Sequence, residues 1–161
     1  MSDFATAWEL CRGRFVASIQ NLTPDQLNWR LHKDALTLGE AAFHFAGAEV
    51  NFAQQLTGQD LDEFGKKLRA AALDGVVNEE KPPFSPEETT WELVKKALDY
   101  GEAIMGPLVR SATPELRQKS LVSVLGPTIT GDGAFARMAF HAAYHDGQAY
   151  LIKNAPGFPR S

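Results

Sequence analysis

The segment FARMAFHAAYHDGQAYLIK, residues 135–153, contains the strongest structural and chemical signal in the chain. It has few helix breakers and an apolar repeat of helical period, so we predict a helix there. His141 and His145 stand four residues apart, and at about 100° per residue their side chains leave the helix on the same side, roughly 6 Å apart at Cβ. This is the spacing of two ligands that bind one metal ion.

Both histidines fall on the face that a bundle helix turns toward the core. That face, followed in steps of three and four residues, consists of Phe135, Met138, His141, His145, Gln148 and Ile152. Polar groups in a core usually have a partner. The pair alone is equally consistent with a metal site and with core histidines that bond to the backbone or to each other through water. A third ligand from elsewhere in the chain would favour the metal.

Length and composition indicate one domain, residues 1–161, of ordinary globular type. The net charge is −4 and the basic residues are scattered, which disfavours nucleic-acid binding. Neither a leader nor an apolar run long enough to span a membrane is visible, so we expect a cytoplasmic protein. The single cysteine, Cys11, excludes an internal disulfide, and its place on an apolar stripe predicts a buried, inert thiol.

The N-terminal third of the sequence predicts two long helices, with a short helical turn and a loop between them. Residues 3–21 carry apolar side chains at helical spacing, with Ser2 or Asp3 as the candidate N-cap. A short helical turn at residues 25–29 and a loop at residues 30–36 follow. His32 lies in this loop beside charged residues, so we expect it to be exposed rather than a ligand.

The second long helix has a clear beginning in Thr37-Leu38-Gly39-Glu40, the pattern of a capping box. The helix is predicted to run to Thr57, with Gly58 placed to cap its end. His44 lies about 100° to one side of the apolar stripe, and small residues flank it. It has room to turn into the bundle, although the same position also suits a surface histidine. Within this helix we expect Glu49 to be either a surface carboxylate or an acceptor for an imidazole N–H.

The remaining segments predict a short extra helix at residues 59–73 and a loop at residues 74–84. The pattern Ser85-Pro86-Glu87-Glu88 predicts the start of a third long helix, which Gly106-Pro107 should kink or end. Residues 112–131 are irregular, with a candidate hairpin formed by Leu121–Leu125 and Thr128–Thr130. The final helix is expected after Gly131-Asp132-Gly133.

Four long amphipathic segments predict an all-α fold, an up-down-up-down-type four-helix bundle with a long connection between helices two and three and an irregular segment before helix four. If helices two and four face each other, His44 can join His141 and His145. Three imidazoles suit a divalent transition metal, Zn or Ni above all, with Fe or Cu also compatible, rather than Mg or Ca. Three protein ligands leave a coordination position open, as in catalytic zinc sites.

Two stretches, LNWRLHKDALTLGEAAFHFAGAE and FHAAYHDGQAYLI, resemble the DinB-like (YfiT-like) superfamily of small bacterial four-helix-bundle metalloproteins. The shared elements fall on Leu27–Arg30, Thr37–His44 and His141–Gln148. The resemblance implies a metal triad of His44, His141 and His145, and a homodimer. Asp146 stands where members often have Arg, so an anion contact at that position is not carried over.

The resemblance also implies a function. Characterised members look like metal-dependent thiol transferases, which attach a low-molecular-weight thiol such as bacillithiol, mycothiol or glutathione to an electrophile. No general base is identified; Glu49, Asn51 and Gln148 are candidates for supporting roles. The alternatives are a non-catalytic metal-binding stress or interaction protein and a metal-dependent hydrolase, although Ala142 occupies the position where His-Glu-x-x-His has its Glu.

Overall fold

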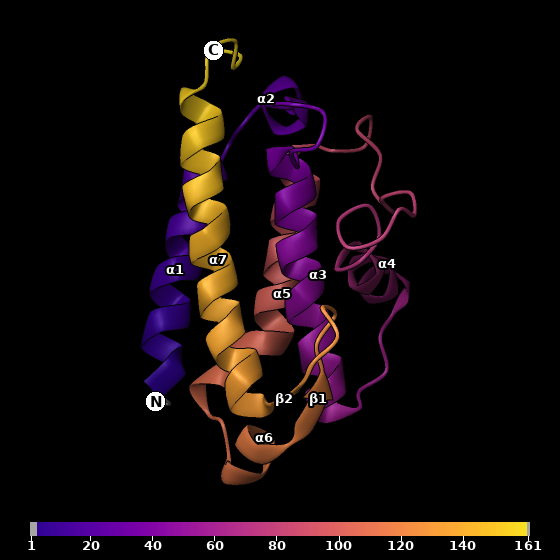
Figure 1. Cartoon of the computed structure of the whole chain (residues 1–161), viewed down its shortest axis with the longest axis vertical. Helices are drawn as coiled ribbons and strands as arrows, with labels where there is room; N and C mark the ends of the chain where they lie inside the picture. Colours follow the sequence, from indigo (N-terminus) through magenta and orange to yellow (C-terminus); the bar gives the residue numbers. More distant parts are fainter. Residues whose placement is uncertain (1–2, 161) are drawn as a thin grey trace.

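The structure, a computed structural model, describes residues 3–160, a range dominated by four long helices (Figure 1). Ser2, a candidate cap of the first helix, lies outside this range. The elements in chain order are α1 (Asp3–Ile19), α2 (Pro24–Asn28), α3 (Leu38–Thr57), α4 (Glu63–Ala71), α5 (Trp91–Arg110), α6 (Pro114–Gln118), β1 (Ser120–Val122), β2 (Thr128–Thr130) and α7 (Gly131–Asn154). The predicted all-α class is therefore confirmed, with one small two-stranded sheet.

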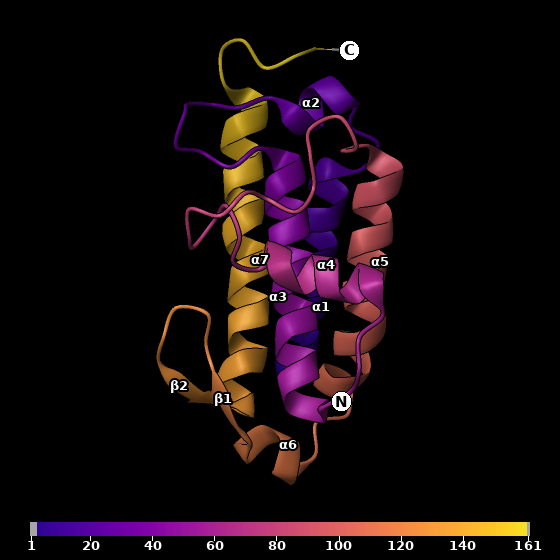
Figure 2. The same ribbon diagram turned by 90° about the vertical axis from the view of Figure 1, so that its right-hand side faces the viewer.

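The long helices lie side by side, with α1 packed against α7, α3 against α5, and α3 also against α7 (Figures 1 and 2). Their directions differ from the predicted up-down-up-down order, because α3 and α5 run parallel and α1 and α7 run the opposite way (Figure 1). Two contacts agree with this parallel course. The starts of the two helices lie together, because a Cβ on Gly39, at the start of α3, would overlap Thr89, which just precedes α5. At the other end, the Lys119 ammonium, from the segment after α5, donates to the Leu56 carbonyl near the end of α3.

The connection between α3 and α5 explains this parallel arrangement. It includes α4, which packs across the outside of α3, and then returns the chain to the end at which α3 began (Figure 2). A short loop would have forced antiparallel neighbours, whereas a long crossover permits parallel ones. The same crossover places α4 over the middle of α3, where it forms a wall beside His44.

The beginning of α3 is the predicted capping box. The Thr37 hydroxyl accepts from the Glu40 amide at 3.1 Å, and the Glu40 carboxylate accepts from the Thr37 amide at 2.8 Å. Gly58 ends the helix with a φ of 73°, in the left-handed region that glycine adopts without strain. These two local signals fix the ends of the helix that carries His44.

The predicted start of the third long helix was wrong. Ser85 and Glu88 do form a cap-like contact, in which the Ser85 amide donates to the Glu88 carboxylate at 3.2 Å, but the turn ends there. The helix begins at Trp91 with Thr90 as its N-cap. It continues through Pro107 to Arg110, so the proline does not end it. A capping signature therefore marked a single turn rather than the helix that follows.

Almost all of α3 is buried, which exceeds the single apolar stripe expected from the sequence. Helices α4, α5 and α7 and strand β1 all pack against it, so little of its circumference faces water. Cys11 on α1 is partly buried against the core, close to the expectation of a buried thiol. Within residues 3–160, none of the helices combines the length and the apolar character needed to cross a membrane.

The irregular segment before the last helix contains the predicted hairpin and an unpredicted short helix, α6. Strands β1 and β2 pair antiparallel with Leu121 opposite Ile129. The Gln55 side chain of α3 accepts from the Val122 amide at 2.9 Å and donates to the Val122 carbonyl at 3.0 Å, which ties the hairpin to the bundle. Thr130 ends β2 and caps α7, so α7 begins at Gly131, before rather than after Gly131-Asp132-Gly133.

Candidate metal centre

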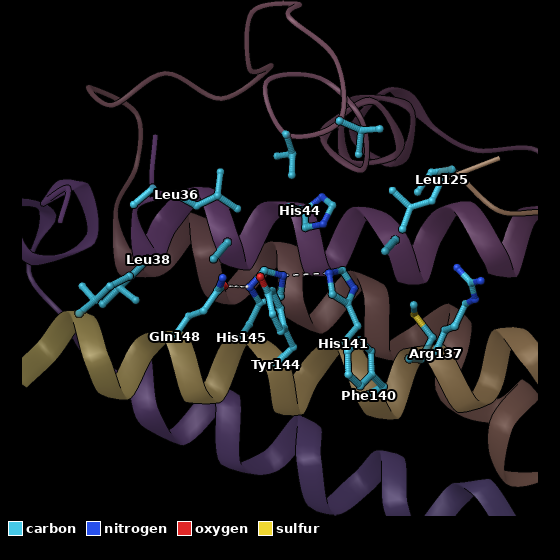
Figure 3. Close-up of a pocket in the computed structure, with 18 of the residues that line it drawn as sticks. Leu36, Leu38, His44, Leu125, Arg137, Phe140, His141, Tyr144, His145 and Gln148 are labelled. Atoms are coloured by element: carbon cyan, nitrogen blue, oxygen red, sulfur yellow. Dashed lines mark hydrogen bonds between the residues drawn. The ribbon is translucent and has the colours of Figure 1, made fainter. Parts of the chain in front are cut away.

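The fold brings three histidines together between α3 and α7 (Figure 3). His44 comes from α3, and His141 and His145 from α7, where one helical turn separates them. One ring nitrogen of each lies within 4.8 Å of the corresponding atom of the other two. His44 and His145 are buried and His141 is half-buried. The third histidine that the sequence could only suggest is thus next to the other two.

The two histidines of α7 form a hydrogen-bonded chain with Gln148 (Figure 3). Nε2 of His145 lies 2.8 Å from Nε2 of His141, and Nδ1 of His145 lies 2.7 Å from the Gln148 amide oxygen. An imidazole that binds a metal through one nitrogen commonly donates its other N–H to a carbonyl or carboxylate. Gln148 therefore holds His145 with Nε2 toward the centre of the cluster, which is the contact that a supporting role for Gln148 would require.

The C-terminal end of α4 packs close to His44. A Cβ at Gly47, one turn further along α3, would overlap the Leu68 carbonyl oxygen and lie 2.7 Å from the Ala72 nitrogen, so only glycine allows α4 to come this close. Nδ1 of His44 is buried without a hydrogen-bond partner among the described residues. A buried nitrogen without a partner is costly unless a ligand satisfies it or the ring turns to meet one.

Burial lowers the pKa of all three histidines. For His141 the charges of His145 and His44 add to burial and lower the pKa to about 2. Burial and the charge of His44 lower the pKa of His145 to about 4, although its bond to Gln148 acts in the opposite direction. For His44, the backbone of Ala71 and Ala72, at the end of α4, raises the pKa and so opposes the larger effect of burial. At neutral pH all three rings are neutral and have lone pairs for a ligand.

A pocket of about 690 Å³ opens beside the three histidines. Its walls are mainly apolar and come from α3, α7, the hairpin and the loop before α3. In Figure 3, Leu36 and Leu38 lie toward one end of this pocket, and Leu125 and Arg137 toward the other. Volume and apolar lining are those of a small-molecule site, with the three imidazoles as its main polar group.

Several other residues singled out in the sequence lie elsewhere. Glu49 is fully buried on a different side of α3, where it accepts from Trp8 Nε1 and Arg12 Nε, each at 3.1 Å, so neither expectation for it was correct. Asn51 accepts from Arg69 Nε at 3.4 Å instead of a histidine. His32 is exposed, as predicted, at the rim of the pocket and outside the cluster.

Asp146 accepts from Arg14 of α1 at 3.3 Å, on the side of α7 that faces α1 rather than the pocket. The pocket does contain a cation that was not predicted from the sequence, Arg137. Its signal was present: it precedes His141 by four residues and so shares the face of the histidines. Ser123, which contacts it from the hairpin, could not be found in the same way, because its place depends on the hairpin's packing.

The fold and the cluster define a helical-bundle protein in which three buried or half-buried histidines, which could bind a metal ion, face a partly open pocket. A sequence model of the DinB superfamily matches residues 7–149, and the chain belongs to that superfamily. Comparisons with curated proteins and with solved structures found no match.

Proposed function

We propose that His44, His141 and His145 bind a divalent transition metal and that the protein is a thiol S-transferase, which joins a low-molecular-weight thiol to an electrophile. Three neutral imidazoles favour Zn or Ni, and Fe or Cu suit the same donors. The donor set is compatible with such an ion: in a tetrahedral site with metal–nitrogen bonds of about 2.0 Å, ligand nitrogens are roughly 3.3 Å apart. Small ring movements would be enough to separate the two Nε2 atoms, now at 2.8 Å, to that distance.

The pocket is the observation that carries this proposal. Histidines with a purely structural role need no cavity, whereas about 690 Å³ beside the cluster leaves room for a ligand at the metal and for a second reactant. A divalent ion held by the three histidines would supply positive charge that lowers the pKa of a bound thiol, so that the nucleophilic thiolate would exist at neutral pH. No protein nucleophile is then required.

The residues around the cluster have distinct tasks in this proposal. Gln148 fixes the orientation of His145 by accepting from its Nδ1–H. The end of α4, which packs closely against α3 at Gly47, lies beside His44 and limits the space on that side of its ring. The apolar pocket lining excludes water from the thiolate and from the electrophile, which limits competing hydrolysis.

The hydrolase alternative has less support. Among the described residues that line the pocket, Asp34 is the one carboxylate, and it lies on the exposed loop before α3. Ala142, at the position of the Glu in His-Glu-x-x-His, is fully buried in the core. A homodimer and a cytoplasmic location are further expectations, to be tested by sedimentation and by fractionation of the source cells.

A conjugation assay tests the proposal. Metal-free protein loaded with Zn²⁺ or Ni²⁺ is mixed with a fluorogenic bimane electrophile and a panel of thiols. We expect turnover by the loaded wild-type protein and loss of turnover in His44→Ala at equal protein concentration. Absence of turnover with every thiol, in protein shown to contain the metal, would contradict the enzyme and favour the non-catalytic metal-binding alternative.

A further inference from the structure

Arg137 differs from most arginines of this protein in what it contacts. Five others pair with a carboxylate: Arg12, Arg14, Arg30, Arg110 and Arg117. Within residues 3–160, Arg137 has no acidic partner; its Nη1 donates to the hydroxyl oxygen of Ser123 at 2.8 Å. It is also the one lysine or arginine among the described residues that line the pocket.

The position of Arg137 is fixed rather than incidental. Ser123 is 2% exposed, and its amide donates to the Pro127 carbonyl at 3.1 Å, so the hydroxyl that accepts from Arg137 is itself held. The neighbouring Val122 is bound through both backbone groups to Gln55 of α3. The hairpin therefore orients a half-buried guanidinium in a pocket that is otherwise largely apolar.

A guanidinium has five N–H donors arranged to bind a carboxylate through two parallel hydrogen bonds. Among the residues that the structure describes, Ser123 is the one acceptor for those donors. Low polarity around such a cation strengthens its attraction for an anion. Arg137 also lies one helical turn, a rise of about 6 Å, from His141 along the same face of α7. An anion bound to it would lie close to a ligand at the three histidines.

We propose that Arg137 recognises a carboxylate on the thiol that binds at the histidine cluster, so that the substrate class is a carboxylated low-molecular-weight thiol. This inference rests on the proposed function and adds the chemical group by which the pocket selects its thiol. Arg137 is thus a specificity-determining residue, and Ser123 is a positioning residue that acts through it.

The test measures binding rather than turnover. Protein loaded with Co²⁺ is titrated with 3-mercaptopropionate and with 3-mercaptopropionamide, which differ in charge at the end remote from the sulfur. Thiolate binding to Co²⁺ produces a near-ultraviolet charge-transfer band, from which Kd follows. We expect wild-type protein to prefer the carboxylated thiol by about 10- to 100-fold, the range of one charge-assisted hydrogen-bonded pair.

Arg137→Gln should lose this preference while its Kd for the amide is retained. Arg14→Gln removes the same charge from the surface and should retain the preference, since Arg14 pairs with Asp146 outside the pocket. Arg137→Lys keeps a cation but loses the paired N–H donors of the guanidinium. Ser123→Ala keeps the guanidinium but removes the hydroxyl that positions it. Each variant should therefore give an intermediate preference. These two variants also test the inference if Arg137→Gln does not fold.

The outcomes separate the two proposals. Bands with both thiols and an equal preference in wild type and Arg137→Gln would overturn the inference about Arg137 and leave the thiol role intact. If neither thiol gives a band in Co²⁺-loaded wild-type protein, the thiol role itself is wrong and the inference falls with it.

Discussion

Nε2 of His145 lies 2.8 Å from Nε2 of His141, so one of the two nitrogens carries the hydrogen and the other the lone pair. The Gln148 amide oxygen can only accept, so the nitrogen 2.7 Å from it, Nδ1 of His145, carries a hydrogen. The neutral His145 ring then has a lone pair at Nε2, and the hydrogen between the two rings belongs to His141. We therefore infer that, without metal, His141 is an Nε2–H tautomer that donates to His145.

Metal binding must change this tautomer. A ligand nitrogen needs its lone pair, so if His141 binds through Nε2, its proton moves to Nδ1 while His145 stays as it is. We predict that ¹⁵N-edited NMR spectra of the imidazoles show His141 converting from Nε2–H to Nδ1–H on addition of Zn²⁺. His145 should show Nδ1–H before and after addition. Spectra in which His141 keeps its Nε2–H in zinc-saturated protein would exclude it as an Nε2 ligand.

Gln148→Ala should weaken metal binding without abolishing it. The substitution removes the acceptor that orients His145, and loss of such a supporting partner typically costs about 10- to 100-fold in metal affinity. Competition with a chromophoric chelator measures the Kd for Zn²⁺. Gln20→Ala, which changes an exposed glutamine just after α1, is the matched control and should bind as wild type does. Equal affinity of the two variants would mean that Gln148 has no part in the site.

Metal-free protein should lose stability in acid, for a reason that lies in the cluster. The folded-state pKa of each histidine is below 6.5, the value for an unperturbed ring, so below that pH the unfolded chain binds protons that the folded chain does not. Stability is therefore complete above about pH 6.5 and falls as pH decreases toward 4. The slope is at most about 4 kcal/mol per pH unit for three histidines.

Glu49 makes stability depend on pH in the opposite direction, and the experiment must separate its effect from that of the histidines. Burial raises its pKa to about 7, against the effects of Arg12 and Trp8, so the folded chain binds the extra proton between pH 4.5 and 7 and stability falls as pH rises there. Urea unfolding of Glu49→Gln between pH 6.5 and 5 isolates the histidine effect, because the carboxyl groups whose pKa is lowered, such as Asp62 and Glu88, lose their contribution at lower pH. Stability in this variant that does not change between pH 6.5 and 5 would contradict the buried neutral cluster.

Gly47→Ala should destabilise the fold and loosen the site together. The new Cβ would overlap the backbone at the end of α4 and force that helix away from His44, at an expected cost of about 1–3 kcal/mol. Gly13→Ala is the matched control, because a Cβ there meets nothing within 4 Å and should stabilise α1 by about 0.5–1 kcal/mol. Denaturant unfolding measures both. A neutral Gly47→Ala variant would show that α4 is not held against α3 as described.

Local signals in the sequence predicted the local features of the site. The capping box at Thr37 and the glycine at position 58 defined α3, and the four-residue spacing of His141 and His145 placed both rings on one face of α7. His44 required more, since its neighbours on the sequence allowed it to face either the core or water. Its place in the cluster follows from the packing of α3 against α7 and from the approach of α4 at Gly47.

The features that the sequence did not reveal depend on non-local packing. Glu49 is buried because α1 supplies Trp8 and Arg12 as its partners, and nothing near Glu49 in the sequence indicates this. The parallel course of α3 and α5 depends on the path of the crossover, which its length alone does not define. The turn at Ser85 has the chemistry of a helix cap, yet the chain continues only one turn before Thr90 caps the helix itself.

We propose that three histidines bind one metal ion, and the metal content of purified protein is the decisive measurement. Tag-free protein, incubated with Zn²⁺ or Ni²⁺ and then desalted, is analysed by plasma mass spectrometry. We predict about one metal ion per chain in wild type and in His32→Ala, and loss of the metal in both His44→Ala and His141→Ala. Wild-type protein that retains no metal, or metal retained in both cluster variants, would show that these histidines do not form a metal site.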